Sequence, residues 1–111
     1  MAKFIPQKGD FVSYYFEVGR GHEQHGRRPA LVVSNSEFNK LTGIVLMCPI
    51  TSVDREYPFH IPIPVGTKVS GVVMVDQIQS ADYEGRKARF LSKSPAGLAE
   101  QVIATIGRII N

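Results

Sequence analysis

The chain has one cysteine, no tryptophan and no apolar run near the roughly 18 residues that would cross a membrane. Cys48 has no second cysteine for an intramolecular disulfide, and its apolar surroundings, IVLMCPI, predict a buried and unreactive thiol. The first ten residues, MAKFIPQKGD, lack the apolar centre of a signal peptide. Nothing in these features favours secretion, and we expect a cytoplasmic protein without a membrane contact.

No repeat, low-complexity tract or linker divides the sequence, so we expect a single domain over residues 1–111. With 43% hydrophobic and 21% charged residues, the chain has the composition of an ordinary folded domain. Its net charge of +3 and pI near 9.2 are mildly basic. This balance permits a polyanionic partner without requiring one.

Short apolar runs between turn residues predict a chain built mainly of strands. The segment FHIPIPV places prolines at every second position, and because proline cannot donate to a sheet, it predicts an edge strand. Pro49 is expected to disrupt or end its strand, leaving Thr51 and Ser52 near the strand mouth. The predicted strands are residues 10–16, 29–35, 43–51, 59–65 and 71–77, with a turn at 39–43.

The C-terminal part changes to a helical period. Ser94 is suited to cap a helix and Pro95 to occupy its first turn. The apolar stripe that follows consists of Leu98, Val102, Ile106 and Ile109. We therefore predict a mainly β (α+β) fold, a small antiparallel barrel or strongly twisted sheet with a C-terminal amphipathic helix.

The segment GRGHEQHGRRPALVVSN, residues 19–35, concentrates titratable and cationic groups in a glycine-rich loop. Pro29 restricts Arg28 to extended geometry, and a guanidinium there offers paired donors that match two phosphate oxygens. The simpler interpretation pairs Arg27 and Arg28 with Glu17 or Glu23 as solvated ions.

Three further features allow two interpretations each. His22 and His25 titrate near neutral pH, but their spacing in a loop does not suit a metal, and we expect none. The hydroxyl of Thr51 either binds a phosphate or satisfies the backbone of its turn. Asp76 either caps a neighbouring loop or contacts Arg28 or the edges of nucleobases.

The motifs GHEQHGRRPALVVS, PIT and GVVMVDQIQS, followed by an amphipathic helix, resemble in order and spacing the MazF/PemK (Kid) family of toxin endoribonucleases. The resemblance covers nearly the whole chain. It implies a homodimer with an SH3-like, CcdB-like barrel and a C-terminal helix. It also implies cleavage of single-stranded RNA, without metal or cofactor, to a 2′,3′-cyclic phosphate and a 5′-hydroxyl. The implied partners are an acidic antitoxin and, only through the antitoxin complex, operator DNA.

The resemblance also implies site residues. The catalytic arginine and threonine of the family fall on Arg28 and Thr51, its loop glutamate on Glu23, and the loop histidine of the PemK branch on His22. Either His22 or Glu23 serves as the base for the 2′-hydroxyl. Met74 stands where the PemK branch has a strand arginine, so the chain combines a PemK-like loop with a MazF-like strand.

Unpaired RNA is read by aromatic stacking and by hydrogen bonds to base edges. Tyr14 is an additional aromatic candidate, and each aromatic side chain either stacks on a base or belongs to the core. The RNA-binding candidates are Arg27, Gln24, Tyr57, Phe59, Asp76, Gln77 and Gln79.

Two other functions share this predicted fold. One is a CcdB-like toxin that poisons gyrase without cleaving nucleic acid, and the other is a non-catalytic SH3-like RNA-binding module. The gyrase poison does not need the set Glu23, Arg28 and Thr51, and the presence of this set favours the nuclease. The binding module predicts RNA binding whose salt slope Arg28→Ala leaves unchanged, and no cleavage.

Overall fold

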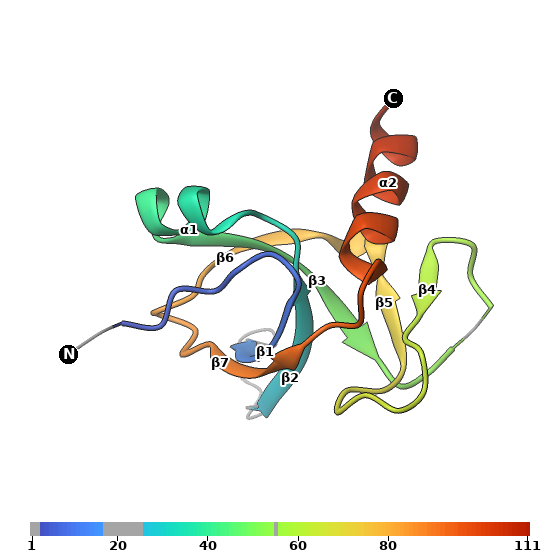
Figure 1. Ribbon diagram of the computed structural model, residues 1–111, viewed down its shortest axis with the longest axis horizontal. Coiled ribbons are helices and arrows are strands. Elements are labelled where there is room, and N and C mark those ends of the chain that lie inside the picture. Colours follow the sequence, from blue (N-terminus) through green and yellow to red (C-terminus); the bar gives the residue numbers. More distant parts are fainter. Residues whose placement is uncertain (1–2, 17–25, 55) are drawn as a thin grey trace, which may run out of the picture.

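The computed structural model describes residues 3–16, 26–54 and 56–111, and Figure 1 shows the arrangement of their elements. The described strands form an antiparallel sheet, with a short helix after the second strand and a longer helix at the C-terminus (Figure 1). The elements are β1 (Asp10–Phe16), β2 (Gly26–Val32), α1 (Ser36–Thr42), β3 (Ile44–Thr51), β4 (His60–Pro62), β5 (Val72–Met74), the 3-10 helix η1 (Val75–Gln77), β6 (Gln79–Asp82), β7 (Arg89–Lys93) and α2 (Leu98–Ile110).

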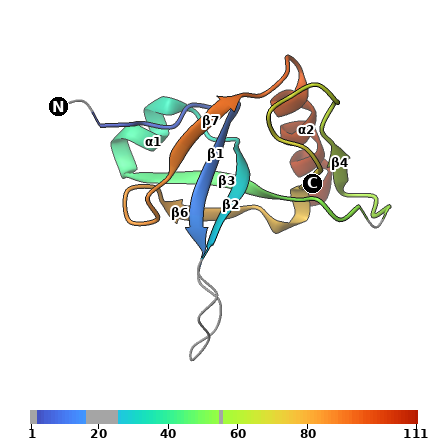
Figure 2. The ribbon, with the colours of Figure 1, turned by 90° about the horizontal axis from the view of Figure 1, so that it is seen from below.

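The strands form one sheet in the order β4-β5-β3-β2-β1-β7, with β6 on the same edge of β3 as β5. Among the described strands, β6 and β7 do not pair with each other. The turn over residues 83–88 joins them, so the sheet curves without closing (Figure 2). The predicted mainly β fold with a C-terminal helix is confirmed, and the sheet is strongly curved rather than a closed barrel.

Each face of the sheet carries its own apolar cluster, because side chains of a strand alternate between faces. On β2, Leu31 belongs to the cluster that α2 covers with Leu98 and Val102. Ala30 and Val32, its neighbours on the strand, belong to the second cluster on the opposite face. Within the described ranges, no helix is long and apolar enough to cross a membrane.

The predicted turn at residues 39–43 is wrong, because these residues complete helix α1. Asn35 caps the helix by accepting from Phe38 N at 2.8 Å, and Gly43 ends it in the left-handed conformation at φ 74°. Asn39 is fully buried and its amide donates to the Pro6 carbonyl at 2.8 Å. A tertiary contact therefore stabilises a helix that is too short to be stable by itself.

The start of the C-terminal helix also differs from the prediction. The backbone N–H of Ser94 donates to the Gly9 carbonyl at 2.8 Å, so Ser94 is tied to the sheet instead of capping a helix. Helix α2 begins at Leu98, after Gly97 in the left-handed conformation at φ 90°. Leu98 and Val102 are buried as predicted, whereas Ile109 at the end of the stripe is 43% exposed.

The predictions about strands need several corrections. The strand predicted over residues 29–35 is β2 over Gly26–Val32, and the strand predicted over residues 71–77 is β5, which ends at Met74 where the 3-10 helix η1 follows. Strand β3 continues through Pro49 to Thr51, with Pro49 opposite Ala30 of β2. Strand β4 is confirmed as an edge strand but extends only over His60–Pro62. Strands β6 and β7 were not predicted, since their sequences, QSAD and RFLSK, show no clean apolar alternation.

Cys48 is confirmed as a buried thiol in β3. Burial and, to a smaller extent, the negative charge of Asp76 together raise its pKa to about 12. The thiol therefore stays protonated near neutral pH, and the reactive thiolate is not formed. Since the unfolded thiol ionises near its ordinary value of 9.0, this group lowers the stability of the fold as the pH rises from that value toward 12.

Candidate active site

The candidate site begins where strands β2 and β3 separate. Their pairing runs from Val32 opposite Met47 to Ala30 opposite Pro49 and ends there. Val33 N donates to the Leu46 carbonyl at 2.9 Å, so the odd-numbered residues of β2 direct their backbone groups toward β3. Pro29 is next in this series and has no N–H to donate. The missing donor explains why the ladder stops and a gap opens between the two strands.

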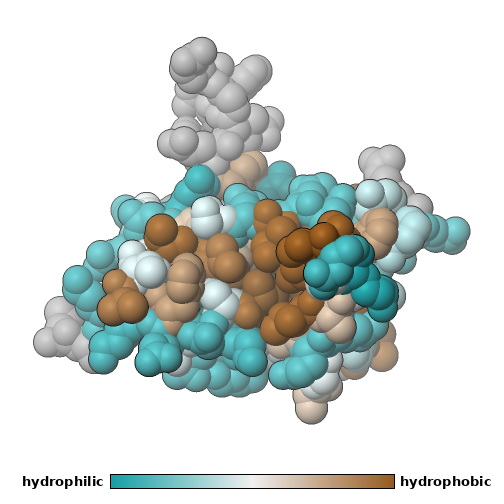
Figure 3. Space-filling view, turned by 90° about the horizontal axis from the view of Figure 1, so that it is seen from above, coloured by the Kyte–Doolittle hydropathy of each residue, from teal (hydrophilic) through white to brown (hydrophobic). Residues whose placement is uncertain are grey.

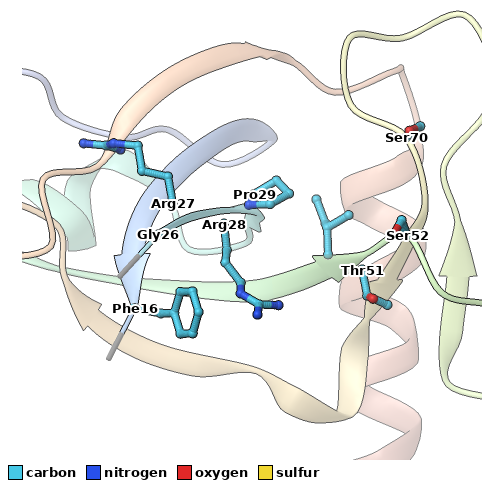
Figure 4. A pocket seen from close by; sticks show the side chains of 9 residues that line it. Phe16, Gly26, Arg27, Arg28, Pro29, Thr51, Ser52 and Ser70 are labelled. Atoms are coloured by element: carbon cyan, nitrogen blue, oxygen red, sulfur yellow. The ribbon is translucent and has the colours of Figure 1, made fainter. Parts of the chain in front are cut away.

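A cleft of about 470 Å³ occupies this gap (Figure 4). Its walls come from the end of β1, the first half of β2, the end of β3 and the segment before β5. Both Arg28 and Thr51 line it, so the structure places the two residues that the sequence singled out in one cavity. The lining residues are Phe16, Gly26, Arg27, Arg28, Pro29, Ile50, Thr51, Ser52 and Ser70.

The strand register explains why Arg28 and Thr51 share the cleft. Extending the pairing of Ala30 with Pro49 by two residues along each strand sets Arg28 opposite Thr51. Both side chains then lie on the face that carries Ala30 and Met47, since side chains alternate along a strand. The separation of the strands opens space between these facing side chains.

The guanidinium of Arg28 lies over the ring of Phe16, with its central carbon 4.1 Å from the ring centroid. This cation–π contact fixes the plane of an exposed side chain, whose edge remains available for hydrogen bonds. Figure 4 shows Arg28 and Phe16 on the same side of β2, with Arg28 directed into the cleft. The cleft therefore presents a positioned pair of donors of the type that binds phosphate oxygens.

Thr51 satisfies the backbone of its turn by accepting from Val53 N at 3.2 Å. This was one of the two roles predicted for its hydroxyl. A hydroxyl group accepts through its lone pairs and donates through its single proton, so this contact leaves the proton available. Thr51 can therefore hold its turn and still donate to an oxygen bound in the cleft.

Arg27 points away from Arg28, to the other side of β2 (Figure 4). Its Nη1 donates to the Ser13 carbonyl at 3.0 Å and to Ser13 Oγ at 2.8 Å, and its Nη2 donates to the Lys87 carbonyl. The guanidinium carbon also lies 4.5 Å from the centroid of the Tyr15 ring. These contacts hold the Arg27 cation in place, whereas Arg28 is held by stacking.

The predicted aromatic candidates separate into core and surface residues. Tyr14 is buried, and burial raises its pKa although Arg28 and Arg86 act in the opposite direction. Tyr57 is 42% exposed and packs edge to face against Phe59, with ring centroids 5.8 Å apart.

Asp76 lies beside this surface pair. Its charge, and a hydrogen bond with the phenol, raise the pKa of Tyr57, so the phenol keeps its proton. Tyr57, Phe59 and Asp76 do not line the cleft. Gln77 and Gln79 are exposed and also lie outside it.

His22, Glu23, Gln24, His25 and Glu17 lie outside the described residues. Phe16 and Ser70 line the cleft but were not among the predicted site residues. Phe16 ends β1 on the face that also carries Arg28, and the strand alternation of DFVSYYF is a signal that could have identified it. Ser70 precedes β5 with no local pattern that marks it, and only the tertiary structure places it at the cleft.

Comparison with known proteins identifies the class of protein that carries this cleft. Residues 7–110 match the family described as PemK-like, MazF-like toxin of type II toxin–antitoxin system. The chain belongs to the PemK/MazF-like toxin family. The resemblance expected from the sequence motifs is thereby confirmed.

Named PemK/MazF-like relatives have endoribonuclease activity. The chain is 34% identical to the endoribonuclease toxin MazF of Escherichia coli strain K12 over 88 residues, 79% of this chain and 78% of that protein. It is 33% identical to the endoribonuclease toxin ChpB of the same strain over 109 residues, 94% of this chain and 93% of that protein. As a family member of this similarity, the chain is an endoribonuclease toxin.

Solved structures confirm the fold. The chain aligns with a MazE–MazF crystal structure from Deinococcus radiodurans (Form-II) at a TM-score of 0.91 and 39% identity, covering 97% of each chain. It aligns with MazF alone from the same organism (Form-I) at a TM-score of 0.87 and 39% identity, covering 97% of this chain and 98% of that one.

Proposed function

We propose that this endoribonuclease toxin cleaves single-stranded mRNA at short sequences, independently of the ribosome, through attack of the 2′-hydroxyl on the neighbouring phosphate. The observation that supports the proposal is the meeting of Arg28 and Thr51 in one cleft. Cleavage of mRNA in the cytoplasm would stop translation and growth, and this effect would explain why the protein is a toxin. A gyrase poison or a binding module gives no reason for this pair of donors.

The reaction needs three groups around one phosphorus. A base removes the proton of the 2′-hydroxyl, the O2′–P bond forms, and the P–O5′ bond breaks as O5′ takes up a proton. The products are a 2′,3′-cyclic phosphate and a 5′-hydroxyl. In the transition state between substrate and products, negative charge develops on the non-bridging phosphate oxygens. Hydrogen-bond donors aimed at such developing charge are often the largest single contribution to catalysis.

In this proposal, Arg28 and Thr51 stabilise that charge. The guanidinium stays protonated, with a pKa above about 12, so it donates hydrogen bonds and does not act as the base. The stacking on Phe16 orients it before substrate binds, which avoids reorganisation during the reaction. His22 or Glu23 removes the 2′-hydroxyl proton, and Tyr57, Phe59, Gln77 and Gln79 are proposed to contact bases beyond the cleft.

The experiment that tests the proposal maps cuts in a long single-stranded RNA incubated with the chain in the presence of EDTA. We expect discrete cuts whose ends carry a 2′,3′-cyclic phosphate and a 5′-hydroxyl. A matched oligonucleotide with a 2′-deoxy sugar at the cut position should bind but stay uncut, because the attacking oxygen is missing. RNA left intact by the active preparation, or cut equally at the deoxy position, would contradict the mechanism.

We also propose that the chain forms a homodimer and binds an acidic, partly disordered antitoxin. Figure 3 shows hydrophobic residues gathered across the face that holds α1 and the end of α2, and surfaces of this kind mark protein contacts. Leu41 of α1 is 84% exposed, and Ile110 of α2 is 75% exposed. Operator DNA is proposed to bind only through the antitoxin complex.

Sedimentation equilibrium measures the dimer directly. The expected mass is about twice the 12.3 kDa of one chain, and Ile110→Glu, which sets a charge on this face, should shift the mass toward one chain. Arg108→Glu on the same helix changes charge without removing an apolar contact and serves as the control. A mass of 12.3 kDa for the unaltered chain at micromolar concentration would contradict the dimer.

A further inference from the structure

A second cavity of about 320 Å³ continues from the cleft, and we call it the flanking groove. Ser13, Lys68, Val69 and Leu91 line the flanking groove alone. The residues that line both cavities are Arg27, Arg28, Pro29 and Ser70. Because they share these walls, the two cavities form one path along the start of β2, where this strand pairs with β1 but not with β3.

The gap at Pro29 makes this path possible. Had β2 and β3 stayed paired, the ladder would have separated the face with Arg28 from the face with Arg27. In Figure 4, Arg28 and Phe16 lie on one side of β2 and Arg27 lies on the other. A chain that passes through the cleft can therefore reach both arginines without leaving the protein surface.

The charge of the path has one sign. The described residues that line the two cavities include Arg27, Arg28 and Lys68 but no acidic side chain. Arg27 is already oriented by its bonds to Ser13 and to the Lys87 carbonyl, so its remaining N–H groups need no reordering to bind an anion. Lys68 is exposed and adds an ammonium with three donors.

We propose that the flanking groove binds a backbone phosphate of the RNA next to the scissile phosphate, with Lys68 and Arg27 as its ligands. This inference rests on the proposed nuclease function and extends it to the strand beyond the cut. Contacts of this kind carry no sequence information, but they set the register of the strand. Lys68 is therefore a positioning residue that holds the scissile phosphate opposite Arg28 and Thr51.

The first test measures the affinity of Lys68→Ala for the uncut 2′-deoxy oligonucleotide as a function of salt. We expect its dissociation constant to rise about fivefold at low salt. The slope of log affinity against log salt should fall in magnitude by about 0.7, the value for one phosphate contact on a single strand. Lys40→Ala, an exposed lysine on α1 that lines neither cavity, should leave both quantities unchanged.

The second test locates the phosphate. One linkage at a time on either side of the cut is replaced by an uncharged methylphosphonate, and each oligonucleotide is titrated with the unaltered chain and with Lys68→Ala. At one flanking linkage the substitution should weaken the unaltered chain at least about fivefold and weaken Lys68→Ala less, because in the variant only the contact with Arg27 remains to be lost. The same substitution elsewhere should weaken both proteins equally.

Three results would overturn the proposal, and they are distinguishable. If the unaltered chain cuts RNA but Lys68→Ala keeps its affinity and salt slope, the flanking groove does not hold RNA. If Lys68→Ala loses affinity only for a polyglutamate peptide, the groove binds an acidic protein segment instead. If the unaltered chain neither binds nor cuts RNA, the nuclease proposal fails together with the groove.

Discussion

Replacing Arg28 with alanine is expected to lower the rate of RNA cleavage by at least about 100-fold, which is the scale of losing one key donor to a transition state. The side chain is exposed and stacks on the surface of Phe16, so the fold should stay intact without it. Single-turnover kinetics with saturating enzyme measures the chemical step apart from binding. The far-ultraviolet circular dichroism spectrum checks that the variant is folded.

Two further variants show whether charge alone explains the loss at Arg28. Arg28→Lys keeps the charge but loses the paired planar donors, and it should recover only part of the rate. Arg108→Ala removes an arginine from the last turn of α2, outside both cavities, and should cleave at the unaltered rate. Cleavage by Arg28→Ala within a fewfold of the unaltered chain would remove Arg28 from the mechanism.

Replacing Gly71 with alanine is expected to damage both stability and cleavage, because this glycine lies against the backbone of Thr51, the proposed donor in the cleft. Gly71 has φ +120°, and a Cβ there would lie 2.2 Å from the Thr51 carbonyl oxygen and 3.2 Å from Ser52 Cα. Because the clashing atoms belong to the backbone, either the end of β3 that carries Thr51 or the segment around Gly71 must shift. We expect a loss of about 2–4 kcal/mol in the free energy of unfolding, from strain and clash together.

The effect of Gly71→Ala on cleavage should be about 100-fold, the usual result of moving a reacting group by about 1 Å. Gly66→Ala is the matched control, because Gly66 also has a positive φ, +96°, but has nothing within 4 Å of the added methyl group. That variant should lose stability only through backbone strain, and it should keep its cleavage rate. Urea unfolding and single-turnover cleavage of both variants measure the two effects, and a fully active Gly71→Ala would show that the position of Thr51 does not limit the reaction.

The residues that line the cleft differ in how far the sequence could predict them. Arg28 and Thr51 were identified from local chemistry and from the family motifs, and both line the cleft. Phe16, which orients Arg28, is separated from it by the loop and acts through a contact between strands. Such a contact depends on register, which a single sequence does not display.

The secondary structure shows the same division. Strands β1 and β3, rich in apolar and β-branched residues, were predicted nearly to the residue. The helix at α1 was missed, since its stability depends on a hydrogen bond from the buried Asn39 to Pro6, which lies far away along the chain. The start of α2 was misplaced for a related reason, because the bond from Ser94 to Gly9 outweighs the local preference of serine for a helix cap.

The sequence by itself determined which chemical groups are available for the cleft and to which face of a strand each belongs. Alternation along β2 puts Arg28 with Ala30, and alternation along β3 puts Thr51 with Met47. Only the tertiary structure decided that the two residues oppose each other, because the pairing of Ala30 with Pro49 comes from packing between distant segments. The same packing turned the backbone of Pro29 toward β3. Proline has no N–H to donate there, and the cleft opens where that hydrogen bond is missing.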